Sequence, residues 1–183
     1  MDPLLFFMLR IFYLILPGAC ANMAPVLIKN HFKKWAVPID MKKKIGKKRI
    51  FGNNKTVRGL IFGVLFSVVI TFIQFVLYRF IPFRAISFFD YSSTWLYAGL
   101  LMGFGVMIGD LVNSFAKRRL GLKPGKQFIP FDQINGLVGG LVFILPVYVP
   151  SLQVIITLFS MVFILHIAIN LFGYAIGLKK NKL

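Results

Sequence analysis

Five long apolar runs limit what this chain can fold into. They lie at about 4–28, 57–80, 94–113, 134–150 and 152–177. A helix of roughly 20 apolar residues crosses the hydrocarbon core of a bilayer. Because a backbone in lipid must satisfy its own polar groups, each run is expected to be helical. The sequence therefore predicts an all-α, multi-pass protein of the cell membrane, a bundle of five transmembrane helices forming a single domain over 1–183.

The basic residues predict the orientation of this bundle. Of the 22 Lys and Arg residues, eleven lie within 29–58, five within 114–132 and three in the C-terminal tail. Cytoplasmic loops are enriched in Lys and Arg. We therefore expect the N-terminus outside, the C-terminus in the cytoplasm, and two basic cytoplasmic loops, 29–56 and 114–133. Such residues attract the anionic lipid of the bilayer, and no nucleic-acid partner is expected.

The first apolar run contains residues that disfavour a regular helix. Pro17 and Pro25 lack an amide donor, so each frees a carbonyl one turn earlier. The run is expected to be locally broken, a state that membrane helices tolerate beside neighbours or a wet cavity. Asn22 lies in this stretch and is a candidate substrate contact.

A polar stripe is expected where the third run leaves the membrane. Asp110 follows the run "GLLMGFGVMIG" (99–109), and an ionisable residue at the membrane edge is a functional candidate. At 100° per residue, one helix face would carry four polar side chains: Asp110, Asn113, Ser114 and Lys117. Arg118 lies to one side of this stripe. Arg119 points almost opposite, so its replacement is expected to have a mild effect.

A second carboxylate, Asp132, precedes the fourth run. One interpretation is a helix cap, because a carboxylate at a helix N-terminus is favoured by the helix dipole. The other pairs Asp132 with Asp110 on the adjacent helix as a site for a hard cation. Mg²⁺ commonly takes one or two carboxylates together with substrate phosphates. We therefore predict a Mg²⁺ site at Asp110 and Asp132.

Basic and amide residues in both loops are candidate anion ligands. In "FGNNKTVRG" (51–59) they directly precede the second run, and backbone amides at a helix start can bind anions. The predicted substrate contacts in this segment are Asn53, Asn54, Lys55, Thr56 and Arg58. Lys126 belongs to the basic turn of the second loop. For Asp40 two interpretations remain: it balances the charge of the basic loop, or it takes part in the site.

Covalent catalysis and a zinc site are not expected. The chain has one cysteine, Cys20, and two histidines, and neither His31 nor His166 neighbours a candidate nucleophile in sequence. Any chemistry is therefore expected to depend on positioning and charge neutralisation.

Two of these motifs resemble a known family. The segment Ser114-Phe-Ala-Lys117-Arg118, followed by Asp132-Gln133-Ile134-Asn135, resembles the signature of CTP-dependent phosphatidate cytidylyltransferases, which reads S-x-x-K-R and later D-R-x-D. Together with "PID…KRIFGNNKTVRG" (38–59), the chain is similar over nearly its full length to the short archaeal relatives, the CDP-archaeol synthases. Gln133 and Asn135 depart from the signature by replacing Arg and the second Asp.

The resemblance implies an enzyme. It implies transfer of CMP from CTP to the isoprenoid ether-lipid phosphate 2,3-bis-O-geranylgeranyl-sn-glycero-1-phosphate, with Mg²⁺, at the cytoplasmic face. It gives Asp110 and Asp132 metal-binding catalytic roles. Ser114, Lys117 and Arg118 take nucleotide-contacting roles, with Lys117 counted among the catalytic residues and Gln133 among the substrate contacts. A homodimer is open, because the bundle is small and the lipid is large.

Two alternatives have less support. A small non-enzymatic transporter or channel subunit for anionic solutes would need polar residues at mid-membrane in several runs, and few are present. A CDP-alcohol phosphotransferase needs a D-G-x-x-A-R motif with further acids, which five Asp residues with this spacing do not supply.

Overall fold

The described part of the chain is mainly helical. The computed structural model describes residues 1–122, 126 and 128–175, with 166–175 described by their backbone alone. Its α-helices are α1 Pro3–Leu27, α2 Val57–Leu77, α3 Ile81–Ile86, α4 Tyr91–Arg119, α5 Phe131–Ile144 and α6 Leu152–Ala175. The loop between α1 and α2 contains a 3₁₀ turn, Lys33–Trp35, and a hairpin of β1 Lys44–Ile45 and antiparallel β2 Lys48–Arg49. Positions 176–177 of the fifth expected run lie outside the described residues.

The five expected membrane helices correspond to five apolar helices. Among the described residues, α1, α2 and α4 are long and apolar enough to span a membrane, whereas Phe131–Ile144 and the described apolar part of α6, Leu152–Leu165, are shorter. The all-α membrane fold is therefore confirmed. The fourth helix begins earlier than the apolar run and ends at Ile144, because Pro146 follows and cannot continue it. At 1.5 Å per residue, α5 is about 21 Å long.

The expected break in the first helix was wrong. α1 is continuous from Pro3 to Leu27 with Pro17 and Pro25 inside it. Pro17 cannot donate to the carbonyl of Tyr13, but Gln74 of α2 donates its Nε2 to that oxygen at 2.6 Å. A neighbouring side chain thus satisfies the carbonyl that the proline frees. The sequence of α1 does not show this partner, which is 61 residues away.

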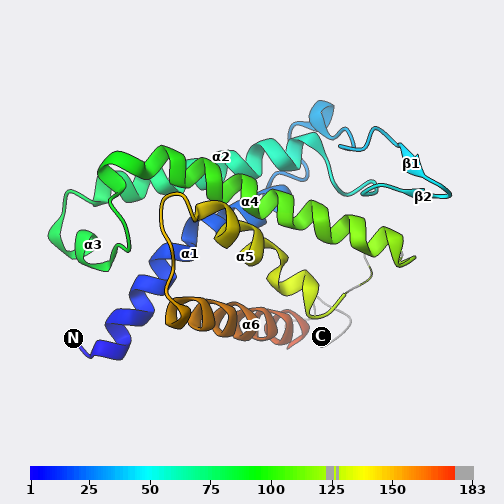
Figure 1. The fold of residues 1–183 in the computed structure, drawn as a ribbon. Helices are drawn as coiled ribbons and strands as arrows, with labels where there is room; N and C mark the ends of the chain where they lie inside the picture. The colour runs from blue at the N-terminus through cyan, green and yellow to red at the C-terminus, as the bar shows by residue number, and fades with distance from the viewer. Residues whose placement is uncertain (123–125, 127, 176–183) are drawn as a thin grey trace.

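α4 is the central helix, and glycines allow it to approach neighbours on two sides. In Figure 1 it lies along α2, with α5 on another side. A Cβ on Gly103 would lie 2.8 Å from the Cα of Val64 in α2. Gly105 and Gly139 each bring the other's carbonyl so close that a Cβ would overlap it. A Cβ on Gly109 would likewise lie 2.2 Å from the carbonyl oxygen of Asn135. Small residues therefore set the antiparallel register of α4 and α5.

Gly139→Ala is expected to destabilise the protein by about 1–3 kcal/mol, because overpacking forces backbone shifts. Its Cβ would lie 2.0 Å from the carbonyl oxygen of Gly105. Gly140→Ala is a matched control, because its Cβ would meet only the side chain of Val106, at 3.4 Å. Thermal unfolding in detergent measures both. Equal stability of the two variants would contradict the close α4–α5 contact.

The hairpin and the C-terminal half of α4 form one end of the molecule. Figure 1 shows β1 and β2 beyond the start of α2, while α3 lies at the opposite end of the bundle. At that opposite end, Arg10 of α1 donates to the carbonyl of Ser87 at 3.1 Å. Between the ends, α1 and α6 share an apolar cluster that includes Ile11 and Leu158, both almost fully buried. The packed helices therefore support the end of the molecule that carries the hairpin.

Candidate active site

Three of the five acidic residues have structural partners. Asp2 accepts the amide of Leu4 at 2.8 Å and caps α1, and Asp90 accepts the amide of Ser92 at 2.9 Å and caps α4. Asp40 is fully buried and accepts hydrogen bonds within its own loop. The remaining two, Asp110 and Asp132, lie at the basic end of the bundle and pair with lysines. These two are therefore the acids left for chemistry.

Asp110 lies on α4 and pairs with Lys55 of the first loop. The Nζ of Lys55 is 2.6 and 2.5 Å from the two carboxylate oxygens. Both side chains are about a quarter exposed. They line a cavity of about 50 Å³, here called the acid cavity, together with Asn54, Thr56, Gly59 and Pro25. This ion pair joins the loop to the helix across 55 residues of sequence.

Asp132 lies in the first turn of α5 and accepts several hydrogen bonds. Asn113 donates its Nδ2 to Oδ1 at 2.6 Å, and the Nζ of Lys117 lies 3.0 and 2.8 Å from the two oxygens. The amide of Phe128 donates to Oδ2 at 2.8 Å. Asp132 does not cap α5 with its side chain, because the N-cap of that helix is Pro130 and receives no side-chain hydrogen bond from the residues that the structure describes. Two side chains of α4 bind Asp132 instead.

The two carboxylates lie at nearby depths on adjacent helices. Asp132 contacts Asn113, which follows Asp110 by three residues on α4. A helix rises 1.5 Å per residue, so these two α4 positions differ by about 4.5 Å along the axis. The polar stripe expected on α4 is divided between two neighbours: Asp110 binds the loop, while Asn113 and Lys117 bind α5.

The other predicted loop contacts have different surroundings. Thr56 lines the acid cavity and also caps α2, because its Oγ1 accepts the amide of Gly59 at 3.1 Å. Asn54 lines the same cavity, whereas Asn53 accepts a bond from Arg49 at 2.7 Å. Arg58 is buried, and its Nη1 donates to the carbonyl of His31 at 2.6 Å. The structure does not bring Arg58 into the lining of the acid cavity.

The candidates outside the first loop are also placed. Ser114 is buried on α4, and Gln133 has a buried Oε1 without a hydrogen-bond partner in the described part of the chain. A donor on a ligand would remove the cost of that unpaired acceptor. Asn22 and Lys126 are exposed, and neither lines the acid cavity.

Arg118 lines a second, larger hollow beside the hairpin. This hollow, here called the basic hollow, has a volume of about 250 Å³, and its other lining residues include Lys48, Arg49, Gly52, Asn53 and Gly121. Asn53 of the basic hollow and Asn54 of the acid cavity are consecutive residues. The two spaces are therefore neighbours along the loop, one with a carboxylate and one with three cations.

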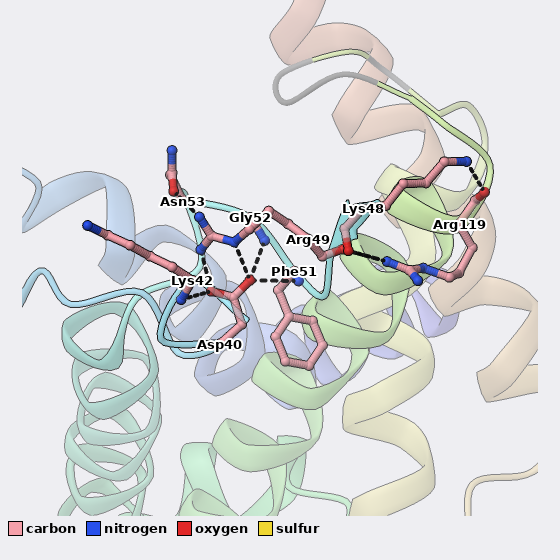
Figure 2. Close-up of polar contacts among 8 residues, drawn as sticks. All are labelled: Asp40, Lys42, Lys48, Arg49, Phe51, Gly52, Asn53 and Arg119. Carbon is pink, nitrogen blue, oxygen red and sulfur yellow. Dashed lines mark hydrogen bonds and ion pairs between the residues drawn. The ribbon is translucent and has the colours of Figure 1, made fainter. Parts of the chain in front are cut away.

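Sequence reasoning missed a set of loop contacts, shown in Figure 2. Asp40 accepts the guanidinium of Arg49 and three backbone amides, including that of Gly52 at 3.0 Å. Burial of Asp40 opposes its ionisation, but these hydrogen bonds outweigh that effect and hold the pKa of the carboxyl well below its usual range. Arg119, whose replacement was expected to have a mild effect, donates to three carbonyls of the hairpin. The Arg119 contacts join residues at least 70 apart, whereas the Asp40 contacts lie within one loop, and no local motif signals either set.

The donor set is suited to a hard cation. Asp110 and Asp132 supply carboxylate oxygens, and an ammonium group already lies against each of them. Among the described residues, no group of three or more His, Cys, Asp or Glu side chains could hold a metal. Two carboxylates with substrate and water as further ligands is the arrangement that Mg²⁺ usually has, so the residues fit such an ion.

Comparison with known proteins decides the family. The family description "CarS-like: CDP-archaeol synthase" matches residues 4–182. The chain belongs to the CDP-archaeol synthase family. It is 35% identical over 170 residues to the CDP-archaeol synthase of Thermococcus kodakarensis, covering 92% of each chain. It is 33% identical over 183 residues to that of Methanococcus maripaludis, covering 98% of each.

A solved structure agrees with the fold. An intramembrane enzyme for archaeal membrane lipids biosynthesis is 25% identical, with a TM-score of 0.71, covering 87% of this chain and 91% of that one. The prediction of a CDP-archaeol synthase, a CTP-dependent cytidylyltransferase of archaeal membrane lipid biosynthesis, is thereby confirmed. Both alternatives, the anion transporter and the CDP-alcohol phosphotransferase, are set aside. Nucleotidyltransferases of this kind usually depend on a metal ion, and the family implies CTP and an archaeal lipid phosphate as substrates.

Proposed function

We propose that Asp110, Asp132 and Lys117 catalyse transfer of CMP from CTP to 2,3-bis-O-geranylgeranyl-sn-glycero-1-phosphate. The observation that carries this proposal is the pair of lysine-bound carboxylates on adjacent helices. One of them, Asp110, lines the acid cavity. They lie where apolar helices meet a basic loop, so one substrate can stay in lipid while the other comes from water.

The reaction needs positioning more than a strong base. An oxygen of the lipid phosphate attacks the α-phosphorus of CTP, a new P–O bond forms, and the bond to the β-phosphate oxygen breaks to release pyrophosphate. A phosphate monoester is largely ionised near neutral pH, because its second pKa is about 6. Neutralising and aligning two anions is then the main task. This agrees with a described site that contains lysines and aspartates but no histidine.

Mg²⁺ is the proposed ion, and Asp110 and Asp132 would hold it. The ion would neutralise phosphate charge and stabilise the charge of the leaving group. Lys55 and Lys117, which now neutralise the carboxylates, would neutralise phosphate oxygens as mobile point charges. Gln133, with its unpaired buried acceptor, is a proposed contact to a donor group of a substrate.

The location of the site follows from charge. The loop that carries Lys55 and the end of α4 that carries Lys117 hold most basic residues of the chain, which supports a site at the cytoplasmic face. We also propose that residues 1–183 form a single domain and that the protein forms a homodimer. The homodimer rests on the small size of the bundle relative to its lipid.

Labelled CTP tests the activity and the face together. CTP carrying ³²P at the α-position is supplied with Mg²⁺ and the archaeal ether-lipid phosphate to inside-out and right-side-out vesicles that contain the protein. Label is expected in the organic phase of inside-out vesicles, and in right-side-out vesicles only after permeabilisation. Phosphatidic acid in place of the ether lipid serves as the control for chain type. Absence of lipid-bound label in both orientations would contradict the proposed function.

A further inference from the structure

The hairpin of the first loop is too small to be stable by itself. Each strand has only two residues, and all four strand residues of the hairpin are exposed or only partly buried. An isolated two-stranded hairpin is marginal in water even when it is longer. The hairpin nevertheless borders the basic hollow through Lys48 and Arg49. Other contacts must therefore hold it at the end of α4.

Arg119 supplies one of these contacts, as Figure 2 shows. Its guanidinium donates to the carbonyls of Ile45 at 3.1 Å, Lys48 at 3.2 Å and Arg49 at 2.6 Å. In return, the Nζ of Lys48 donates to the carbonyl of Arg119 at 2.8 Å, at the C-terminal end of α4. The planar guanidinium has several donors in a fixed fork, so it can bind several carbonyls at once. One side chain thus joins the hairpin to α4.

Asp40 supplies the second contact, within the loop. It binds the guanidinium of Arg49 and the amides of Phe51 and Gly52, at 3.1 and 3.0 Å. Gly52 has φ +101°, a conformation that favours glycine. Asp40 binds both β2, through Arg49, and the segment after it, through the amides of Phe51 and Gly52. The position of the hairpin therefore also determines the position of residues 53–55, which follow directly.

The loop is thereby attached to α4 at two points. Lys55 binds Asp110, and Arg119, nine residues later on α4, binds the hairpin. The basic hollow lies beside this frame. The acid cavity has room for only a few waters, since one water needs about 10–15 Å³, whereas the basic hollow is about five times larger. The phosphates of CTP must therefore extend beyond the acid cavity, and the basic hollow is the adjacent cationic space.

We infer that Arg119 and the Asp40–Arg49 pair are positioning residues that assemble the CTP side of the site before CTP binds. The inference rests on the proposed function. If the loop is assembled in only a fraction of the free molecules, the apparent Kd for CTP equals the intrinsic Kd divided by that fraction. Bound CTP can reassemble it, so turnover at saturation is retained. The lipid is expected to bind among the apolar helices, outside this frame.

Arg119→Ala is the test, with Lys44→Ala as a matched control on the same exposed hairpin. Arg119→Ala is expected to raise the KM for CTP by about tenfold and to leave kcat within about twofold, as expected if about a tenth of free molecules keep the loop assembled. The KM for the lipid phosphate should not change. Arg119→Lys should recover only part of the loss, because an ammonium lacks the planar fork. Lys44→Ala should resemble the wild type.

Limited proteolysis at the lysines of the hairpin gives a measurement that does not depend on activity. Trypsin should cleave Arg119→Ala faster than the wild type after Lys47 and Lys48, and CTP should slow that cleavage. An unchanged KM for CTP together with unchanged cleavage would overturn the inference. Equal losses for both substrates, or a lower kcat with an unchanged KM, would also overturn it, because these indicate general damage to the fold. The proposed function fails separately, if the wild type transfers no label.

Discussion

Asp110→Asn and Asp132→Asn should each reduce kcat/KM for CTP by at least about a thousandfold, because each removes a charged ligand from the proposed metal site and electrostatic stabilisation is usually the largest catalytic contribution. The double variant should lose little more than either single variant, since residues that act as a unit are strongly non-additive. The label-transfer assay measures all three.

These losses should occur in folded protein. The Lys55–Asp110 and Lys117–Asp132 pairs are partly exposed, and such pairs contribute on the order of 1 kcal/mol to stability. Asp90→Asn is the matched control, because Asp90 caps the other end of α4 and asparagine caps helices about as well as aspartate. Its activity should equal that of the wild type. Near-normal turnover of Asp132→Asn would leave Asp132 with only a structural role, as the partner of Asn113 and Lys117.

Lys117→Ala should raise the KM for CTP by about a hundredfold, which corresponds to about 2.7 kcal/mol, while leaving the dependence on divalent metal recognisable. The physical reason is that Lys117 is 12% exposed and neutralises Asp132 through both oxygens. Its loss leaves that carboxylate with Asn113 and one amide. The site then becomes more negative where CTP must approach.

Steady-state kinetics at several Mg²⁺ concentrations separate these effects. Lys117→Arg should be intermediate, because the charge remains but its geometry changes. Lys34→Ala, at an exposed lysine of the first loop, should match the wild type. If Lys117→Ala has a normal KM for CTP but an altered Mg²⁺ requirement, Lys117 does not contact the phosphates of CTP. Its role would then be to position Asp132 as a metal ligand.

The parts of the fold that the sequence predicts are those fixed by local patterns. Apolar length identified five helices, and the angular spacing on α4 correctly placed Asn113 and Lys117 together, since both bind Asp132. Small residues in a membrane helix permit close packing, and the structure places two glycines before Asp110, Gly105 and Gly109, against α5. Local periodicity was sufficient because each of these features lies within one helix.

The parts that the sequence did not predict depend on partners far along the chain. Gln74 keeps α1 continuous through Pro17, although nothing near Pro17 shows it. The Lys55–Asp110 pair joins residues 55 apart. Helix angles showed correctly that Arg119 points away from the stripe, but they could not show that a hairpin lies on that side. Side chains with several donors, such as arginine, acquire their roles from tertiary contacts.

Asp110 and Asp132 are proposed to hold one divalent metal together. Electron paramagnetic resonance of Mn²⁺ tests this proposal directly, because the signal of free Mn²⁺ falls when the ion binds. Purified protein with a non-hydrolysable CTP analogue is titrated with Mn²⁺ for the wild type, Asp110→Asn, Asp132→Asn and the Asp90→Asn control. We expect one tight Mn²⁺ site in the wild type and in Asp90→Asn, and its loss in Asp110→Asn and in Asp132→Asn. Tight Mn²⁺ binding that survives in Asp110→Asn or Asp132→Asn would contradict a site shared by the two carboxylates.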